Sequence, residues 1–237
     1  MKMIKPFSIA ALIPVGSGDR SWKALLPRFA NLPEGSEIIL SAAEPAPKEN
    51  EFSSPLPCSW IEGRPGRANQ LNRAAGKTQC PYLWFIHADS SFEPSALEAL
   101  TWSLAAKPNA IHYFRLAFDP AANPLMRLNA AGANFRSRWL KMPFGDQSFC
   151  LSKSTWLKLG GFDAQAKYGE DHLLVWRARH LGIELVEVDA KMTTSSRKYQ
   201  RDGWANTTAR HVLLTAKQAA PEWIKLMWKK WTAEDQI

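Results

Sequence analysis

Residues 82–90 read YLWFIHADS, an apolar run that ends abruptly in a histidine, His87, and a carboxylate, Asp89. Residues 81–86 are apolar without alternation, which indicates a strand buried on both faces and favours a parallel sheet covered by helices. In open α/β sheets, ligands bind at the carboxyl ends of the strands. Asp89 is therefore a candidate ligand for a metal or a polar substrate, although it could instead cap a helix that starts near Pro94.

Length and composition favour one large domain in a reducing compartment. The chain has 237 residues, of which 46% are hydrophobic, enough to bury a substantial core. Three widely spaced cysteines, Cys58, Cys80 and Cys150, form no Cys-x-x-Cys pair and are expected to be reduced structural thiols. The apolar run 7–15 is too short to span a bilayer and lacks a small-residue cleavage site, so we expect a cytoplasmic protein.

The formal charge of +8 favours anionic partners. Basic residues gather in two short groups, around Arg64 and Arg67 and around Arg197 and Arg201. Such groups fit phosphate clamps better than a nucleic-acid stripe, and no nucleic-acid-binding motif accompanies them, so we expect no nucleic-acid partner. The alternative for either group is an exposed, solvated helix face.

Strand and helix patterns alternate along the chain. The predicted strands are 7–15, 37–40, 59–61, 83–86, 111–118, 147–151 and 184–188, and the predicted helices are 21–29, 67–77, 94–106, 125–140, a short one ending at 159, and 171–181. This order predicts an α/β fold with a mostly parallel central sheet in a three-layer sandwich. The run Gly16-Ser17-Gly18 lacks the third glycine of a dinucleotide fingerprint, and the chain contains no P-loop motif.

Carboxylates follow several of these elements. Asp89 follows the strand 83–86, Asp146 lies in the run 144–147, and Glu170 and Asp171 open a helix. The last pair could simply favour the helix dipole, but a carboxylate at a helix start beside a cleft could also take a proton from a hydroxyl. Asp89 would meanwhile bind a divalent cation that offsets the charge of a leaving diphosphate. Together these two roles describe glycosyl transfer.

Five short motifs follow one another along the chain: residues 63–72 (GRPGRANQLN), 83–90 (LWFIHADS), 145–147 (GDQ), 159–162 (LGGF) and 169–171 (GED). In this order they resemble the motifs of family 2 glycosyltransferases with the GT-A fold, in particular a small bacterial branch whose metal-site strand ends in His-Ala-Asp. The resemblance covers most of residues 7–203. It implies a GT-A-like fold and an inverting, metal-assisted transfer of sugar from a nucleotide-sugar donor to an acceptor hydroxyl, with Mg²⁺ or Mn²⁺ as the cofactor.

The resemblance also implies a role for each matching position. Asp89, with His87 on the same strand face, matches the metal-binding motif, and Asp171 matches the catalytic base, with Glu170 beside it. Three groups complete the expected site: Arg64, Arg67 and Asn69 near the nucleotide, Asp146 and Gln147 near the donor or acceptor sugar, and Arg197 and Arg201 as diphosphate clamps within the basic motif 195–204.

Two loops depart from the family pattern. Residues 15–19 (VGSGD) and 41–45 (SAAEP) stand where the family usually carries an Asn-Glu pair and an Asp-rich loop, and only Asp19 and Glu44 supply carboxylates there. The donor nucleotide is therefore left unidentified. A non-catalytic protein that binds a nucleotide or sugar is the alternative to an active enzyme.

The carboxyl-terminal part ends in a basic, tryptophan-bearing amphipathic helix. Ile224, Met227, Trp228 and Trp231 share one helical face. We expect residues 1–205 to form the GT-A-like domain and residues 206–237 a helical tail. This tail either packs on the domain or a second subunit, which we favour, or rests on the inner membrane near a lipid-linked acceptor. The acceptor itself is unknown.

Overall fold

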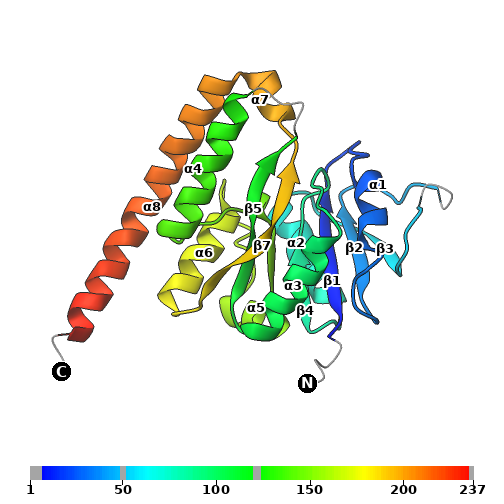
Figure 1. The fold of residues 1–237 in the computed structure, drawn as a ribbon, viewed down its shortest axis with the longest axis horizontal. Coiled ribbons are helices and arrows are strands. Elements are labelled where there is room, and N and C mark those ends of the chain that lie inside the picture. Colours follow the sequence, from blue (N-terminus) through cyan, green and yellow to red (C-terminus); the bar gives the residue numbers. More distant parts are fainter. Residues whose placement is uncertain (1–6, 49–51, 120–123, 235–237) are drawn as a thin grey trace.

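The computed structural model describes residues 7–48, 52–119 and 124–234, which contain a seven-stranded sheet between helices (Figure 1). The strands are β1 (Ile9–Val15), β2 (Glu37–Ala42), β3 (Cys58–Glu62), β4 (Tyr82–Phe85), β5 (Ile111–Phe118), β6 (Phe149–Ser152) and β7 (Leu185–Thr194). Their order across the sheet is β3-β2-β1-β4-β6-β5-β7. Only β6 runs antiparallel to its neighbours β4 and β5; the other neighbouring pairs are parallel. The predicted mostly parallel α/β sheet is confirmed.

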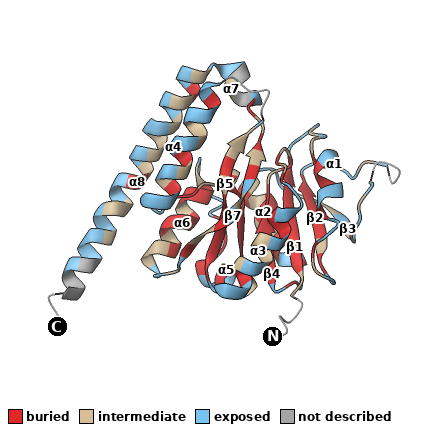
Figure 2. Ribbon diagram, viewed as in Figure 1, coloured by how far each residue is buried: buried red, intermediate tan, exposed pale blue. Residues whose placement is uncertain are grey.

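Helices cover both faces of this sheet, which makes the three predicted layers. One face carries α1 (Trp22–Leu25), the short 3₁₀ helix η1 (Leu26–Phe29) and α3 (Ser95–Ala106), and the other carries α2 (Arg67–Lys77), α5 (Lys153–Leu159) and α6 (Glu170–His180). Beyond them, α4 (Leu125–Trp139) packs on β5, and the short α7 (Arg197–Asp202) leads into the long α8 (Trp204–Glu234). Figure 2 shows buried residues concentrated in the strands and exposed ones on the outer sides of the helices.

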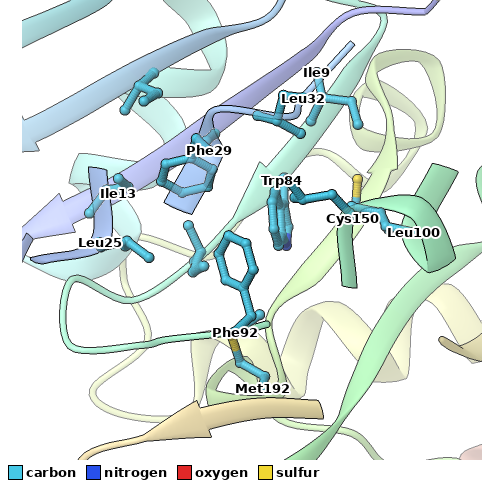
Figure 3. Packing of buried hydrophobic residues seen from close by; sticks show 14 of the residues in the cluster. Ile9, Ile13, Leu25, Phe29, Leu32, Trp84, Phe92, Leu100, Cys150 and Met192 are labelled. Atoms are coloured by element: carbon cyan, nitrogen blue, oxygen red, sulfur yellow. The ribbon is translucent and has the colours of Figure 1, made fainter. Parts of the chain in front are cut away.

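The central strand β4 is buried on both faces, as the apolar run predicts. Trp84 points into one layer, where its ring lies 5.6 Å from Phe29, 5.1 Å from Phe92 and 5.7 Å from Phe114 (Figure 3). Leu83 and Phe85 point into the opposite layer. Each buried side chain of this size stabilises the fold by roughly 2–3 kcal/mol. The strand is therefore a rigid base for the polar residues that follow it.

Several boundaries differ from the sequence prediction. Strand β7 continues past the predicted end at 188 to Thr194, because it stays paired with β5 as far as Phe118 across a register shift at Phe114/Arg115. Gln147 ends the short 3₁₀ helix η3 (Gly145–Gln147), and β6 starts only at Phe149. These changes extend β7 toward the end of β4, where the candidate site lies.

The carboxyl-terminal segment is a single helix, α8, which passes through Pro221 and starts before the predicted tail boundary. It packs on Trp176 and Met142 through Ala219, Trp223 and Leu226. The face singled out in the sequence points away from this contact, since Ile224, Met227, Trp228 and Trp231 are each 58–64% exposed. No helix among the described residues is long and apolar enough to cross a membrane.

Candidate active site

The site lies at the edge where β4 and β7 end. After β4, the backbone turns at His87, whose carbonyl accepts a hydrogen bond from Ser90 N at 3.1 Å. Ser91 and Thr193 then form an isolated antiparallel bridge with two N–H···O bonds of 2.8 Å. This bridge fixes the segment that carries Asp89 beside the end of β7.

Asp89 faces the basic motif that follows β7. Its Oδ2 lies 3.4 Å from Nη2 of Arg197, and the same Nη2 donates to Ser21 Oγ at 2.9 Å. The pair is partly exposed, with 62% of the Arg197 side chain and 30% of the Asp89 side chain accessible. Because such exposed pairs are worth about 0–1 kcal/mol, Arg197 can exchange this contact for a phosphate at little cost. Arg201 instead pairs with its neighbour Asp202 and is 77% exposed.

Arg67 contacts three other expected site residues, namely His87, Glu170 and Asp171, and so brings them into one cluster. It comes from the first turn of α2, and its guanidinium forms an ion pair with Glu170 through Nε. Its Nη2 lies 3.4 Å from Asp171 Oδ1 and its Nη1 lies 3.3 Å from His87 Nε2. Burial alone would lower the pKa of Arg67, but Asp171 and Glu170 raise it, so the guanidinium stays charged.

Asp171 is held ionised at the start of α6. Its Oδ2 accepts a hydrogen bond from Gly145 N at 2.6 Å. Burial alone would raise the pKa of Asp171, but Arg67 and the backbone N–H groups of Gly145 and His172 bring it below the ordinary value. A side chain at Gly145 would place its Cβ 2.8 Å from Asp171 Oδ2, so this close approach requires glycine.

His87 is neutral in this surrounding. Burial and the adjacent Arg67 lower the pKa of His87 to about 4, despite the opposing influence of Asp89 and Asp171. Its Nε2 faces an arginine, so the imidazole presents an acceptor lone pair rather than a charge.

Asp146 lies near Asp171, but its pKa is shifted in the opposite direction. The residue is half-buried, and its Oδ1 is fully buried without a hydrogen-bond partner among the described residues. Burial raises the pKa of Asp146 to about 6; Arg136 opposes this shift and Asp171 adds to it. Buried polar atoms without a partner are uncommon in folded proteins, so Asp146 is a candidate functional residue.

Three expected site residues, Arg64, Asn69 and Gln147, are either exposed or bonded to other parts of the chain. The Arg64 side chain is exposed, and Asn69 Nδ2 donates to Pro65 O at 2.9 Å within its own turn. Gln147 is fully buried, and its amide bonds to Ser137, Phe144 and Phe114, which leaves it holding η3 in place. Its surroundings give no support to a sugar contact.

The residues after β4 supply only part of a binding site for a cation. Within the described part of the chain, no three His, Cys, Asp or Glu side chains converge on one point. Asp89 offers a carboxylate and His87 an imidazole at the same sheet edge. Mg²⁺-type ions are often held by one or two carboxylates together with substrate phosphates, so a shared site of this kind is compatible with Asp89.

The diverged loops after β1 and β2 close on each other. Glu44 accepts hydrogen bonds from Ser17 Oγ at 3.0 Å and from Gly18 N at 3.2 Å. Asp19 instead accepts a hydrogen bond from Ser21 N at 2.8 Å within the turn that precedes α1. Of the two carboxylates that the sequence offered here, Glu44 is the one that ties the loops together.

A pocket of about 350 Å³ unites the cluster with α8. Arg67, His87, Asp146 and Asp171 line one side, and Arg210, His211, Leu214, Thr215 and Gln218 of α8 line the other. Gln218 Oε1 lies 2.8 Å from His172 Nδ1, which attaches the helix directly behind Asp171. Sequence reasoning missed this wall, because the tail signalled only an apolar face and its polar residues have no motif.

The chain matches no protein-family model and no curated protein sequence, but it resembles solved glycosyltransferase structures. The mannosyltransferase PcManGT of Pyrobaculum calidifontis, solved with GDP-Man and Mn²⁺, is 14% identical with a TM-score of 0.67, over 91% of this chain and 64% of that one. Residues 1–349 of S. aureus TarS are 13% identical with a TM-score of 0.61, over 80% and 60%. GalNAc-T7, solved with UDP, GalNAc and Mn²⁺, is 12% identical with a TM-score of 0.55, over 81% and 44%.

The chain spans less than two thirds of each of these structures. At such low identity the likeness establishes the fold alone. The fold is that of GT-A glycosyltransferases, as the motif resemblance implied.

Proposed function

We propose that this protein is a family 2 type glycosyltransferase that moves a sugar from a nucleotide-sugar donor to an acceptor hydroxyl with inversion. The proposal rests on one observation above the others. At the end of β4 in a GT-A fold, Asp89 pairs with Arg197, and the ionised Asp171 lines a nearby pocket that also contains His87. The solved neighbours hold GDP-Man, UDP or UDP-GlcNAc, two of them with Mn²⁺, which supports a nucleotide-sugar donor.

The proposed chemistry gives Asp171 the role of general base. Its carboxylate takes the proton of the acceptor hydroxyl as the new bond forms between that oxygen and the anomeric carbon. The bond from the anomeric carbon to the diphosphate oxygen breaks, and its electron pair leaves with the nucleoside diphosphate. Arg67 and the N–H of Gly145 keep Asp171 ionised and oriented, with Glu170 as the second partner of Arg67.

The other site residues would hold the donor. Arg197 would leave Asp89 for a phosphate, and Asp89, with His87 nearby, would hold a divalent cation. When bound, the cation supplies positive charge that stabilises the leaving diphosphate. Glu44, which bonds to Ser17 and Gly18 in the loops after β1 and β2, is proposed to exchange these bonds for the nucleoside. Arg64, Asn69 and Arg201 remain proposed outer contacts, and Asp146 is proposed to contact a sugar or acceptor hydroxyl.

The test separates donor binding from chemistry. Titration calorimetry with UDP and GDP, with and without Mn²⁺, should show metal-dependent binding to the wild type and to Asp171→Asn, but not to Asp89→Ala. Asp171→Asn should in addition lose sugar transfer and sugar-nucleotide hydrolysis. Asp189→Ala, which removes an exposed carboxylate in the middle of β7 that pairs with Arg115, is the control and should behave as the wild type. Equal nucleotide affinity of wild type and Asp89→Ala would overturn the proposal.

One observation favours the non-catalytic alternative. Ser17 and Gly18 already bond to Glu44, so the loops that would receive a nucleoside are satisfied internally. A protein that binds a sugar or nucleotide without transferring it would show the metal-dependent binding but no turnover with any donor. Appreciable hydrolysis or transfer would exclude this alternative.

The location of the protein in the cell and the roles of its two parts belong to the same proposal. We propose a cytoplasmic protein in which residues 1–205 form the catalytic unit and the tail supplies a wall of the site together with a surface for peripheral contact with the inner membrane. The exposed apolar face of α8 supports the second role of the tail. The tail boundary is a functional division only, since α8 starts at Trp204.

A further inference from the structure

An apolar groove runs between α4 and α8. Its volume is about 510 Å³, and its walls include Leu128, Leu140, Val212, Ala216 and Trp223. The two helices lie side by side in Figure 1, and Asn129 Nδ2 of α4 donates to Thr208 Oγ1 of α8 at 3.2 Å. The groove is thus a built feature between two connected helices, large enough for an extended chain of carbon atoms.

The groove is continuous with the candidate active site. Phe144, Asp146, His211 and Thr215 line both the groove and the polar pocket that contains Asp171. Asp146 therefore stands where the two cavities meet, with its unpartnered Oδ1. A molecule that places a hydroxyl near Asp171 and Asp146 can extend into the groove without leaving the protein surface.

The outer rim of the groove is apolar and open to solvent. Leu128 is 63% exposed and Val212 is 62% exposed although both line the groove, and Figure 2 shows that the outer sides of α4 and α8 are largely exposed. Phe135 and Trp139 add further exposed apolar surface on α4, at 60% and 70%. Exposed apolar side chains on the walls of a groove, such as Leu128 and Val212, indicate a binding site.

Polar and charged groups stand at the end of the groove that meets the candidate active site. Arg136 of α4 lines the groove, where its Nε donates to Met142 O at 2.9 Å and its guanidinium lies over the Phe144 ring. Arg210 of α8 lines the adjoining polar pocket. Apolar walls that lead to such a polar end match an amphiphile whose headgroup lies at the candidate site and whose chain lies in the groove.

We propose that the acceptor is an amphiphile, a hydroxylated headgroup on an aliphatic chain, with its hydroxyl near Asp171 and Asp146 and its chain in the α4–α8 groove. The inference rests on the proposed transferase function and names its substrate class. The proton of the acceptor hydroxyl passes to Asp171, and the sugar carbon replaces it on that oxygen. The chain takes no part in this exchange and supplies binding alone.

Binding of alkyl glucosides provides a test that needs neither donor nor turnover. Calorimetry with glucosides of two to ten carbons, each below its micelle concentration, should show affinity rising up to about four-fold for every methylene buried. Gly132 lines the groove, and a Cβ there meets nothing within 4 Å, so Gly132→Phe fills the groove from α4. This variant should lose the dependence on chain length. Gly76→Phe, at an equally open helical glycine on α2, is the matched control and should keep it.

Affinity that does not change with chain length in the wild type would overturn the proposal, as would a Gly132→Phe variant with the full wild-type dependence. A groove covered by a second copy of this chain would appear as a dimer in sedimentation that Gly132→Phe dissociates, with no glucoside binding, and would overturn it too. Metal-dependent nucleotide binding, measured on the same proteins, reports the proposed function separately. Its absence alongside chain-length-dependent glucoside binding would reject the transferase and retain the groove.

Discussion

Asp146 is a residue whose position opposes stability. In an unfolded chain its carboxyl has the ordinary pKa of 3.8, but burial raises the pKa to about 6 in the fold, against the opposing effect of Arg136. The folded protein therefore binds this proton more tightly than the unfolded chain. The stabilising contribution is full below pH 3.8 and is lost as pH rises through 6, so at neutral pH the ionised carboxylate costs free energy.

Asp146→Asn should remove that cost. At pH 8 we expect the variant to be more stable than the wild type by about 1–3 kcal/mol, whereas near pH 4 the two should be nearly equal. Urea unfolding at both pH values measures this difference. Asp163→Asn, on an exposed loop, is the control and should change little at either pH. If the variant is no more stable than the wild type at pH 8, the ionised Asp146 carboxylate does not destabilise the fold.

Arg67, unlike Asp146, stabilises the fold, because its positive charge neutralises Glu170 and Asp171. Arg67→Ala leaves Glu170 and Asp171 side by side at the start of α6 without their shared cation. Removing one member of a fully buried pair costs roughly 3–5 kcal/mol, but the Arg67 side chain is 38% exposed, so we expect only about 1–2 kcal/mol. Arg115→Ala breaks a more exposed pair with Asp189 and should cost less than 1 kcal/mol in the same urea titration. Equal losses for the two variants would argue against an integrated cluster.

At the scale of elements, the attachment of α8 behind Asp171 depends on Gly169. This residue has a left-handed backbone, with φ of 64°, and a Cβ there would collide with the side-chain amide of Gln218. Gly169→Ala combines backbone strain of about 1 kcal/mol with that collision, and should displace the Gln218 amide from His172 and loosen the middle of α8. Gly182→Ala has the same strain, with φ of 67°, but open space around the Cβ.

The difference between these two variants isolates the helix contact. Hydrogen exchange should rise across the middle of α8 in Gly169→Ala and stay at the wild-type level there in Gly182→Ala. Thermal unfolding should show both variants destabilised, the first by more. Unchanged exchange in α8 for Gly169→Ala would mean that Gln218 can move aside and that the His172–Gln218 contact does not fasten the helix.

The sequence predicts the sheet well because its strands are marked by local burial patterns. The run before His87 identifies β4 and the position of Asp89 after it, and the acids after other elements identify Asp146 and Asp171, which line one pocket with His87. Contacts between distant elements are not encoded locally. Gln147 satisfies its amide with Ser137 and Phe114, and Arg197 reaches Asp89 because β7 continues to Thr194 and the Ser91–Thr193 bridge holds the Asp89 segment beside it, so neither result follows from a motif.

At the scale of the whole molecule, apolar exposure is uneven. The sheet buries its apolar residues efficiently, yet α8 exposes Ile224, Met227, Trp228 and Trp231 on one face and packs on the domain with the other. Lysines flank the exposed face at Lys225 and Lys229. An amphipathic helix with tryptophans on its apolar side and lysines on its border has the composition of an interfacial membrane helix.

We therefore expect the full chain to float with vesicles that contain anionic phospholipid at low salt. The bound fraction should fall as salt is raised, because the lysines are screened while the apolar face is not. The double variant Ile224→Glu/Trp228→Glu places charge on the contact face and should reduce binding by at least about ten-fold, since each charged residue must otherwise enter the interface. Trp102→Glu/Leu157→Glu removes equally exposed apolar residues on α3 and α5 and should float as the wild type does. If the wild type stays unbound at low salt, or if the two double variants lose binding equally, the α8 face is no membrane contact. The amphiphile would then have to reach the α4–α8 groove from solution.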